Sequence, residues 1–210
     1  MKFGEYAKIE TEFNTKYISK NAIIVFFNNY FLSRLASLVE SVNSSKILDV
    51  GCGEGIVANF LTNKLFLKPN QIVGIDIEPN RLRIARGINP KVQFSQGSIY
   101  NLPFQNNSFD LVLALEVLEH LEFPEKAIGE LNRISKNWVI ISVPNDWMFR
   151  LGNMLRLKYL SFWGNNPHHI QHWRKRTFES LITKYMHVIK IKAPFLLWLV
   201  LLCNTKNEDR

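Results

Sequence analysis

Asp49-Val50-Gly51-Cys52-Gly53-Glu54-Gly55 is the most informative segment of this chain for its fold. It follows a short apolar run that begins at Lys46, and it precedes a helical pattern over residues 56–65. Three glycines spaced two apart permit a tight turn between a strand and a helix, and they let a ligand approach the backbone at the amino end of that helix. The stretch predicts a ligand-binding turn at the carboxyl end of a buried strand.

The acidic residues of this turn indicate which kind of ligand it binds. A dinucleotide-binding turn has its third glycine where this chain has Ile56. Asp49 lies two positions before the first glycine and Glu54 lies inside the turn, where both carboxylates would repel a pyrophosphate. The turn suits a ligand that carries no negative charge at this point.

Asp76 is a second candidate for ligand binding, at the end of a predicted strand over residues 71–76. It follows Gly51 by 25 positions, close to the spacing of about 20 at which an acidic side chain binds ribose hydroxyls in a strand-helix-strand unit. The alternative is that Asp76 only caps the helix that follows it. The turn and Asp76 together indicate a nucleoside ligand.

Strands and helices alternate along most of the chain. Apolar residues at steps of three and four predict helices over 21–42, 56–65, 80–86, 124–135 and 178–186, the last with Thr177 as its N-cap. Short apolar runs predict strands at 46–51, 71–76, 92–95, 109–115, 138–143, 188–191 and 195–203. The predicted fold class is α/β, a Rossmann-like doubly wound seven-stranded sheet with helices on both faces. The sheet is mostly parallel, and the short link at Ala193-Pro194 makes the last strand antiparallel.

The length of 210 residues predicts one domain, 1–210. We divide it into an N-terminal helical cap (1–45), a ligand-binding core (46–145), a basic aromatic segment (146–176), and a helix with a terminal β-hairpin (177–210). Two cysteines, Cys52 and Cys203, exclude a disulfide framework. The N-terminus has no apolar stretch typical of a signal peptide, and the longest apolar run, 193–203, is shorter than the roughly 20 residues of a membrane span. We expect a cytoplasmic protein.

Five motifs, in order and spacing, resemble those of the class I S-adenosylmethionine-dependent methyltransferases. They are Asp49 to Gly55, Gly74-Ile75-Asp76, residues 96–104 (Gln-Gly-Ser-Ile-Tyr-Asn-Leu-Pro-Phe), residues 108–112 (Ser-Phe-Asp-Leu-Val) and residues 115–121 (Leu-Glu-Val-Leu-Glu-His-Leu). Within that family the set is most similar to the small-molecule branch that includes the ubiquinone and menaquinone biosynthesis methyltransferases. The resemblance covers residues 40–145 and is weak after Pro144.

The resemblance implies S-adenosylmethionine as cofactor, with S-adenosylhomocysteine as product. Asp49 would lie near the amino group of the cofactor's methionine part, Asp76 would bind both ribose hydroxyls, and Ile77 and Ile99 would flank the adenine. Ser98 stands where the family commonly has Asp, so its contact with the adenine amino group departs from the pattern. Leu115 and Glu116 would close the pocket beside the methyl group. The cofactor's methionine part would lie along Gly51, Cys52, Gly53 and Gly55.

Histidines are the candidates for acid-base chemistry. A sulfonium methyl group is already activated, so positioning the nucleophile supplies much of the catalysis, and a general base helps an acidic nucleophile such as a phenol. His120, beside Glu119, is the first candidate for this catalytic base, and a helix-end residue bonded to the backbone is the alternative. His168, His169 and His172 follow as candidates in a substrate-contacting loop. We predict no metal site, because no carboxylate accompanies these three histidines in sequence.

The net charge of +8 is confined to one end of the chain. Residues 1–146 hold 15 basic and 15 acidic residues, whereas residues 147–210 hold 11 basic and 3 acidic ones. Residues 147–163 add five large aromatic residues to three cations and no acid. Residues 147–176 could form a lid inserted after the fifth strand, a peripheral contact with an anionic membrane, or a core-packing helix whose cations point to water.

The predicted function is methyl transfer from S-adenosylmethionine to a small, apolar or amphipathic acceptor, at oxygen or carbon. A transfer RNA or protein methyltransferase is the alternative enzyme, although the neutral body and the lack of an RNA-binding module disfavour nucleic acid. A non-catalytic cofactor-binding partner subunit is the alternative of another class. The acceptor and the oligomeric state stay open at this point.

Overall fold

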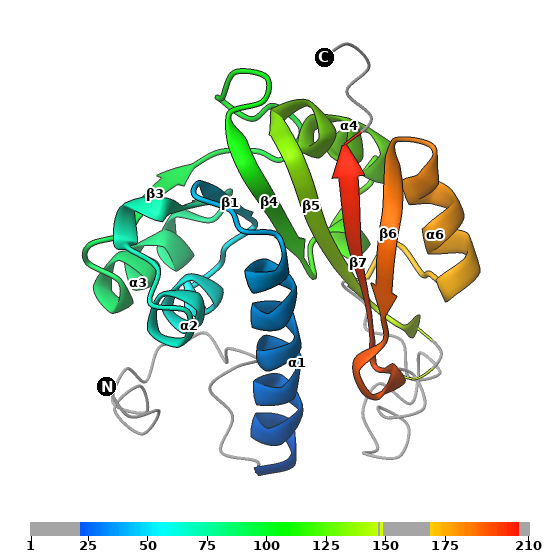
Figure 1. Cartoon of the computed structure of the whole chain (residues 1–210), viewed down its shortest axis with the longest axis horizontal. Helices are drawn as coiled ribbons and strands as arrows, with labels where there is room; N and C mark the ends of the chain where they lie inside the picture. Colours follow the sequence, from blue (N-terminus) through cyan, green and yellow to red (C-terminus); the bar gives the residue numbers. More distant parts are fainter. Residues whose placement is uncertain (1–21, 147, 149–168, 206–210) are drawn as a thin grey trace.

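A computed structural model describes residues 22–146, 148 and 169–205. Seven strands form one sheet in the order β3-β2-β1-β4-β5-β7-β6 (Figure 1). Their bounds are β1 Ile47–Val50, β2 Ile72–Asp76, β3 Gln93–Gln96, β4 Phe109–Leu115, β5 Ser135–Pro144, β6 Met186–Lys192 and β7 Trp198–Thr205. The seven-stranded α/β sheet predicted from the sequence is confirmed.

Strand β1 lies at the centre of the parallel part of the sheet. It pairs with β2 on one side and with β4 on the other, so that Asp49 lies level with Gly74 and Leu113. The chain leaves β1 toward one edge of the sheet and later returns to β4 on its other side, and ligands bind at such a switch point, beyond the carboxyl ends of the strands. The glycine turn follows β1 at this point.

The last strand is antiparallel, as the sequence predicts. β7 inserts between β5 and β6 and pairs antiparallel with both. It is buried almost throughout, because both neighbours cover its backbone and helices lie on the two faces of the sheet.

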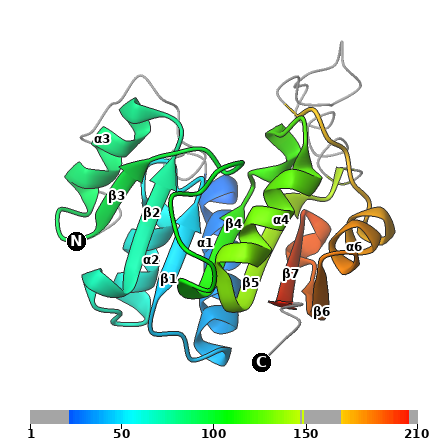
Figure 2. The same cartoon turned by 90° about the horizontal axis from the view of Figure 1, so that it is seen from above.

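Helices cover both faces of the sheet (Figure 2). They are α1 Ala22–Ser41, α2 Ile56–Lys64, α3 Pro79–Ile88, α4 Pro124–Ile134 and α6 Lys175–Thr183, with short 3₁₀ helices η2 Pro69–Gln71, η3 Leu118–His120 and η5 Pro194–Leu196. The apolar residues of α1, α2 and α3 belong to one core cluster and those of α4 and α6 to another. Alternate residues of β4 serve the two clusters: Leu113 faces the first and Val112 the second.

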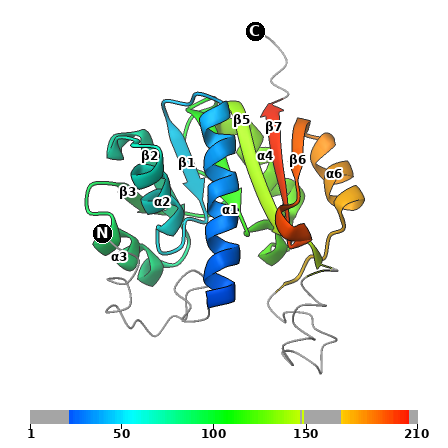
Figure 3. The ribbon, with the colours of Figure 1, turned by 60° about the horizontal axis from the view of Figure 1, so that its bottom comes forward.

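Helix α1 runs along one face of the sheet (Figure 3). Its buried residues, at helical spacing, are Phe31, Leu32, Leu35, Leu38 and Val39. The Phe31 ring lies 5.1 Å from that of Trp198, centroid to centroid, at the start of β7. This contact joins α1 to the strand that closes the sheet, so α1 is part of the same core.

Two predicted boundaries near the C-terminus are wrong. Thr177 is not the N-cap of the last helix, because α6 begins at Lys175 and Arg174 takes the cap position. From inside the first turn, the Thr177 hydroxyl accepts the Arg174 N–H (3.1 Å) and donates to its carbonyl (2.9 Å). The helix ends at Thr183 instead of continuing to residue 186, because Met186 already pairs with Thr205 in the sheet.

Candidate active site

The glycine turn after β1 has a backbone that glycine adopts readily. Gly51, Gly53 and Gly55 have φ angles of 72°, 52° and 73°, in the left-handed region. A Cβ atom added at Gly51 would collide with Cγ2 of Val117, and one added at Gly55 would lie 2.8 Å from Nδ2 of Asn89. Both backbone angle and space require glycine at these two positions.

Hydrogen bonds to β2 fix the turn in place. The N–H groups of Gly51 and Cys52 both donate to the carbonyl of Ile75, at 2.7 and 3.1 Å. The N–H of Gly53 donates to Oδ2 of Asp76 at 2.8 Å. Cys52 is buried, and burial raises the pKa of its thiol, so the side chain packs in the core as a thiol.

Two buried carboxylates lie beside this turn. Asp49 is 2% exposed and Asp76 is 6% exposed. Burial, helped by the negative charge of Asp76, raises the pKa of Asp49 to about 7. Within the described residues, Oδ2 of Asp49 is buried with no hydrogen-bond partner. Such an oxygen is satisfied by a ligand that brings a donor and a positive charge, which fits the amino group of a methionine moiety.

Ile77, Ser98 and Ile99 occupy the neighbouring edge of the sheet. Ile77 follows Asp76 at the end of β2 and is 62% exposed, which leaves an apolar surface for a planar ring. Ile99 is 8% exposed and packs mainly in the core. The Ser98 hydroxyl accepts the N–H of Tyr100 at 3.3 Å, which still leaves its proton and a lone pair for a ligand.

Leu115 and Glu116 lie where β4 ends. Leu115 is 8% exposed in the core. The Glu116 carboxylate accepts hydrogen bonds from the Ser142 hydroxyl (3.2 Å) and from the indole N–H of Trp198 (3.1 Å). Its backbone has a φ of 58°, which is unusual for a residue other than glycine. Glu116 thus joins β4, β5 and β7 at the edge where the cofactor is expected.

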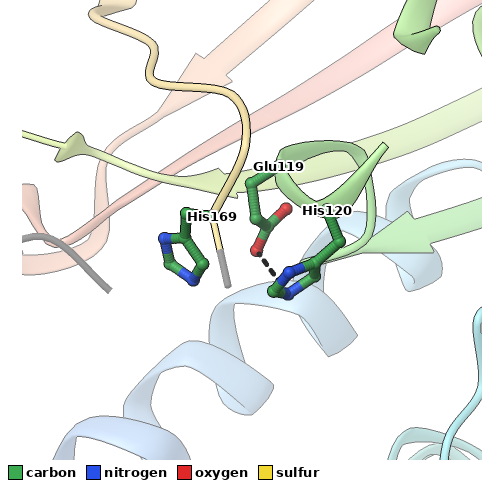
Figure 4. Close-up of side chains that lie close together, drawn as sticks. All are labelled: Glu119, His120 and His169. Carbon is green, nitrogen blue, oxygen red and sulfur yellow. Dashed lines mark ion pairs between the residues drawn. The ribbon is translucent and has the colours of Figure 1, made fainter. Parts of the chain in front are cut away.

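His120 lies on η3, immediately after β4, and its side chain is 44% exposed. Its Nε2 is 3.9 Å from Oε1 of the buried Glu119. The ring of His169 lies 5.0 Å from that of His120, centroid to centroid, so the three side chains form one group (Figure 4). The structure brings His120 together with one of the three later histidines.

Another of the predicted histidines, His172, has a different partner. His172 Nδ1 is 2.8 Å from Oδ1 of Asp146, a pair that joins the two described ends of the basic aromatic segment. His168 and most of residues 147–176, the predicted lid, lie outside the described residues.

Asn89 contacts the glycine turn, although no pattern in the sequence selects it. It is buried at the end of α3, and its side-chain amide donates to the carbonyls of Gly55 (3.0 Å) and Ala85 (3.2 Å). Asn59, from α2, donates to its Oδ1 at 3.0 Å. No spacing pattern identifies a lone asparagine of this kind, because its partners come from three different elements.

A parallel sheet with a glycine turn at its switch point, and an acidic residue at the end of the neighbouring strand, defines a Rossmann-like nucleoside-binding domain. Residues 48–141 match a family model described as a methyltransferase domain. This part of the chain is a methyltransferase domain of the S-adenosylmethionine-dependent class, as its five motifs predict.

Two similar relatives are named methyltransferases, and a solved structure has the same fold. Ajmaline N-methyltransferase from Rauvolfia serpentina is 34% identical over 103 residues, 46% of this chain and 34% of that protein. The mitochondrial ubiquinone biosynthesis O-methyltransferase of Candida albicans is 30% identical over 112 residues, 49% of this chain and 33% of that protein. The PH0226 protein from Pyrococcus horikoshii shares the fold, with a TM-score of 0.69 at 19% identity, over 96% of this chain and 99% of that one.

The two named enzymes are matched over part of their length only. The chain spans about a third of each of these curated relatives. Among the helices that the structure describes, none is long and apolar enough to cross a membrane.

Proposed function

We propose that the protein transfers the methyl group of S-adenosylmethionine to a small acceptor, and that the acceptor atom is an oxygen. The observation that carries the proposal is the pair of buried carboxylates beside the glycine turn. The buried Asp49 carboxylate disfavours a pyrophosphate and suits a ligand with an ammonium group and a sulfonium centre, while Asp76 suits ribose hydroxyls.

The residues that would hold this cofactor come from three strand ends. Asp49 and the glycine turn would bind the methionine part, Asp76 the ribose, and Ile77 and Ser98 the adenine. The cofactor supplies a methyl group that is already activated by its bond to a positively charged sulfur. The task left to the chain is to position the acceptor and to handle its proton.

His120 is the residue that we assign to the acceptor side. It lies at the same edge of the sheet as the glycine turn, since Val117, three residues earlier, faces Gly51. Its exposed imidazole can meet a bound acceptor, and its Nε2 lies 3.9 Å from Oε1 of the buried Glu119.

Methyl transfer to nitrogen is the second candidate, and the Rauvolfia relative favours it, since its name describes N-methylation. The Candida relative favours oxygen, since its name describes O-methylation. Both names describe small-molecule chemistry, which supports a small acceptor. No comparable observation supports methyl transfer to carbon, to transfer RNA or to protein. No observation supports a membrane contact of residues 147–176 either.

The first experiment measures S-adenosylmethionine affinity by calorimetry for the full chain and for Asp76→Ala. Loss of two strong acceptor contacts should weaken binding at least tenfold. Glu78→Ala is the matched control, because Glu78 is an exposed acid two positions away. Equal affinities for the full chain and Asp76→Ala, or no binding by either, would contradict the cofactor assignment.

A second experiment follows tritium from the methyl-labelled cofactor into acceptors. Phenols, aliphatic amines, transfer RNA and a protein mixture are compared at equal concentration. Label in phenols alone is the expected result. Label in amines alone would move the proposal to nitrogen, and label in transfer RNA or protein alone would overturn the small-acceptor part of it.

A further inference from the structure

Glu119, His120 and His169 form a cluster with the composition of a metal site. Each residue offers one ligand atom, and these atoms all lie within 4.8 Å of one another. Glu119 and His120 come from η3, whereas His169 comes from the segment that precedes α6 (Figure 4). Two imidazoles and one carboxylate are ligands that divalent transition metals bind in proteins.

Backbone hydrogen bonds hold the two halves of this cluster together. The carbonyl of Glu119 accepts the N–H groups of Ile170 (2.8 Å) and Gln171 (3.0 Å). The side-chain amide of Gln171 donates to the carbonyl of Leu121 at 3.1 Å. Three hydrogen bonds between the two segments therefore fix the backbone next to His169 beside Glu119.

The spacing of the cluster is slightly wider than that of a filled site. Ligand atoms about 2.1 Å from one metal ion lie roughly 3 to 4 Å apart. The 3.9 Å between His120 Nε2 and Glu119 Oε1 already meets this range. His120 is exposed and His169 is half-buried, so small side-chain rotations suffice to bring the third ligand in.

We propose that Glu119, His120 and His169 bind one divalent transition-metal ion, with further positions left to water or to a ligand oxygen. Glu119 is 2% exposed and supplies the negative charge. The exposed side of the cluster, at His120, gives the ion a path of entry. The sequence did not reveal the site, because the carboxylate ligand precedes His169 by 50 positions.

The role of this ion rests on the proposed methyl transfer. A cation bound here would coordinate the acceptor hydroxyl and lower its pKa. The hydroxyl proton then passes to water, and the acceptor oxygen forms a bond to the methyl carbon. The bond from that carbon to sulfur breaks, and sulfur keeps its electron pair. In this arrangement His120 is a metal ligand and not the base.

The test of binding uses Co²⁺, whose visible absorption reports coordination by nitrogen and oxygen. Tag-free full chain, treated with a chelator and dialysed, is titrated with Co²⁺ alone. We expect one equivalent to bind, and His169→Ala to weaken binding at least tenfold. His187→Ala is the matched control, because His187 is an exposed histidine on β6 and lies outside the cluster.

The outcomes separate the metal site from the proposed function. Stoichiometric binding that His169→Ala reduces and His187→Ala does not would support the site. No saturable Co²⁺ binding by the full chain, or equal binding by His169→Ala, would overturn it. Cofactor affinity is measured on the same samples: its retention in His169→Ala shows that the domain is folded, and its absence in the full chain would count against the methyltransferase proposal alone.

A second readout tests the catalytic role. If the ion activates the acceptor, chelator treatment should reduce methyl transfer at least tenfold and Co²⁺ or Mn²⁺ should restore it, with cofactor affinity unchanged. Metal binding without any effect of chelation on turnover would leave the site in place and overturn its catalytic role.

Discussion

The backbone N–H of Gly53 donates a 2.8 Å hydrogen bond to Oδ2 of Asp76, so the glycine turn and the end of β2 are fixed to each other. The other carboxylate oxygen accepts the N–H of Glu78 at 2.9 Å. An ionised carboxylate has about four acceptor sites, and these two bonds leave room for ribose hydroxyls. Asp76 is therefore oriented before a ligand arrives. The alternative that it is the N-cap of α3 is wrong, because Glu78 takes that position.

Alanine substitutions in the glycine turn should have graded costs. Gly53→Ala should lower the free energy of unfolding by about 1–2 kcal/mol, because its φ is left-handed but the nearest atom is 4.0 Å away. Gly51→Ala should cost about 2–4 kcal/mol, since a collision with Val117 is added. Gly129→Ala in α4 is the control and should stabilise by about 0.5–1 kcal/mol. Urea unfolding measures all three, and equal costs at Gly51 and Gly53 would contradict the structure.

Asp49 should make the cofactor-free protein less stable as the pH rises. Its pKa is about 7 in the folded protein and 3.8 as an ordinary carboxyl, so the folded state holds the proton longer and stability falls between about pH 4 and pH 7. Asp49→Asn, which cannot ionise, should be more stable than the natural chain at pH 8 by up to about 4 kcal/mol. The difference should shrink toward pH 4. Urea unfolding at both pH values checks this, and a constant difference would contradict the raised pKa.

Cofactor binding should release protons near neutral pH. In the free protein Asp49 is about half protonated at pH 7, and a bound ammonium group would favour its ionised form. Calorimetry in two buffers of different ionisation enthalpy should then show release of about half a proton per cofactor. Asp49→Asn should bind more weakly and release none through this residue. Unchanged proton release in Asp49→Asn would remove Asp49 from the cofactor site.

Asn89 should stabilise the start of α2 through its bond to the Gly55 carbonyl. Asn89→Ala removes the donor from a buried carbonyl, which should cost about 1–3 kcal/mol in unfolding free energy and also weaken cofactor binding. Asn63→Ala is the control: its side chain is exposed and bonds within α2, so the change should stay within about 0.5 kcal/mol. Thermal or urea unfolding measures both changes. An unfolding free energy of Asn89→Ala equal to that of the unsubstituted chain would show that the bond does not stabilise α2.

The core of the fold was predictable because its signals are local. Strands β1, β2, β4 and β5 contain short apolar runs and the helices follow a pattern of period 3.6, and alternation of the two specifies a parallel sheet. The boundary error at Thr177 has a local cause as well. A threonine hydroxyl bonds to the backbone three residues away either as the N-cap or from inside the first turn, and the sequence alone does not separate these two cases.

The candidate cofactor site was predictable for a related reason. The carboxyl ends of neighbouring parallel strands meet at one edge, so Asp49, Asp76 and Glu116 could be assigned to one region from their strand positions alone. Their individual partners could not be assigned. Glu116 bonds to Ser142 and Trp198, which come from strands β5 and β7, and hydrogen bonds of this kind leave no spacing pattern in the sequence.

The α/β fold, the glycine turn and the acidic end of β2 follow from the sequence, because each depends on residues close together in the chain. The raised pKa of Asp49 comes from its burial in the tertiary structure, which also brings His169 close to Glu119 and His120. Backbone hydrogen bonds from Ile170 and Gln171 make that approach, and backbone groups are the same in every residue. No residue pattern could therefore have indicated that a buried carboxylate and two imidazoles share one site.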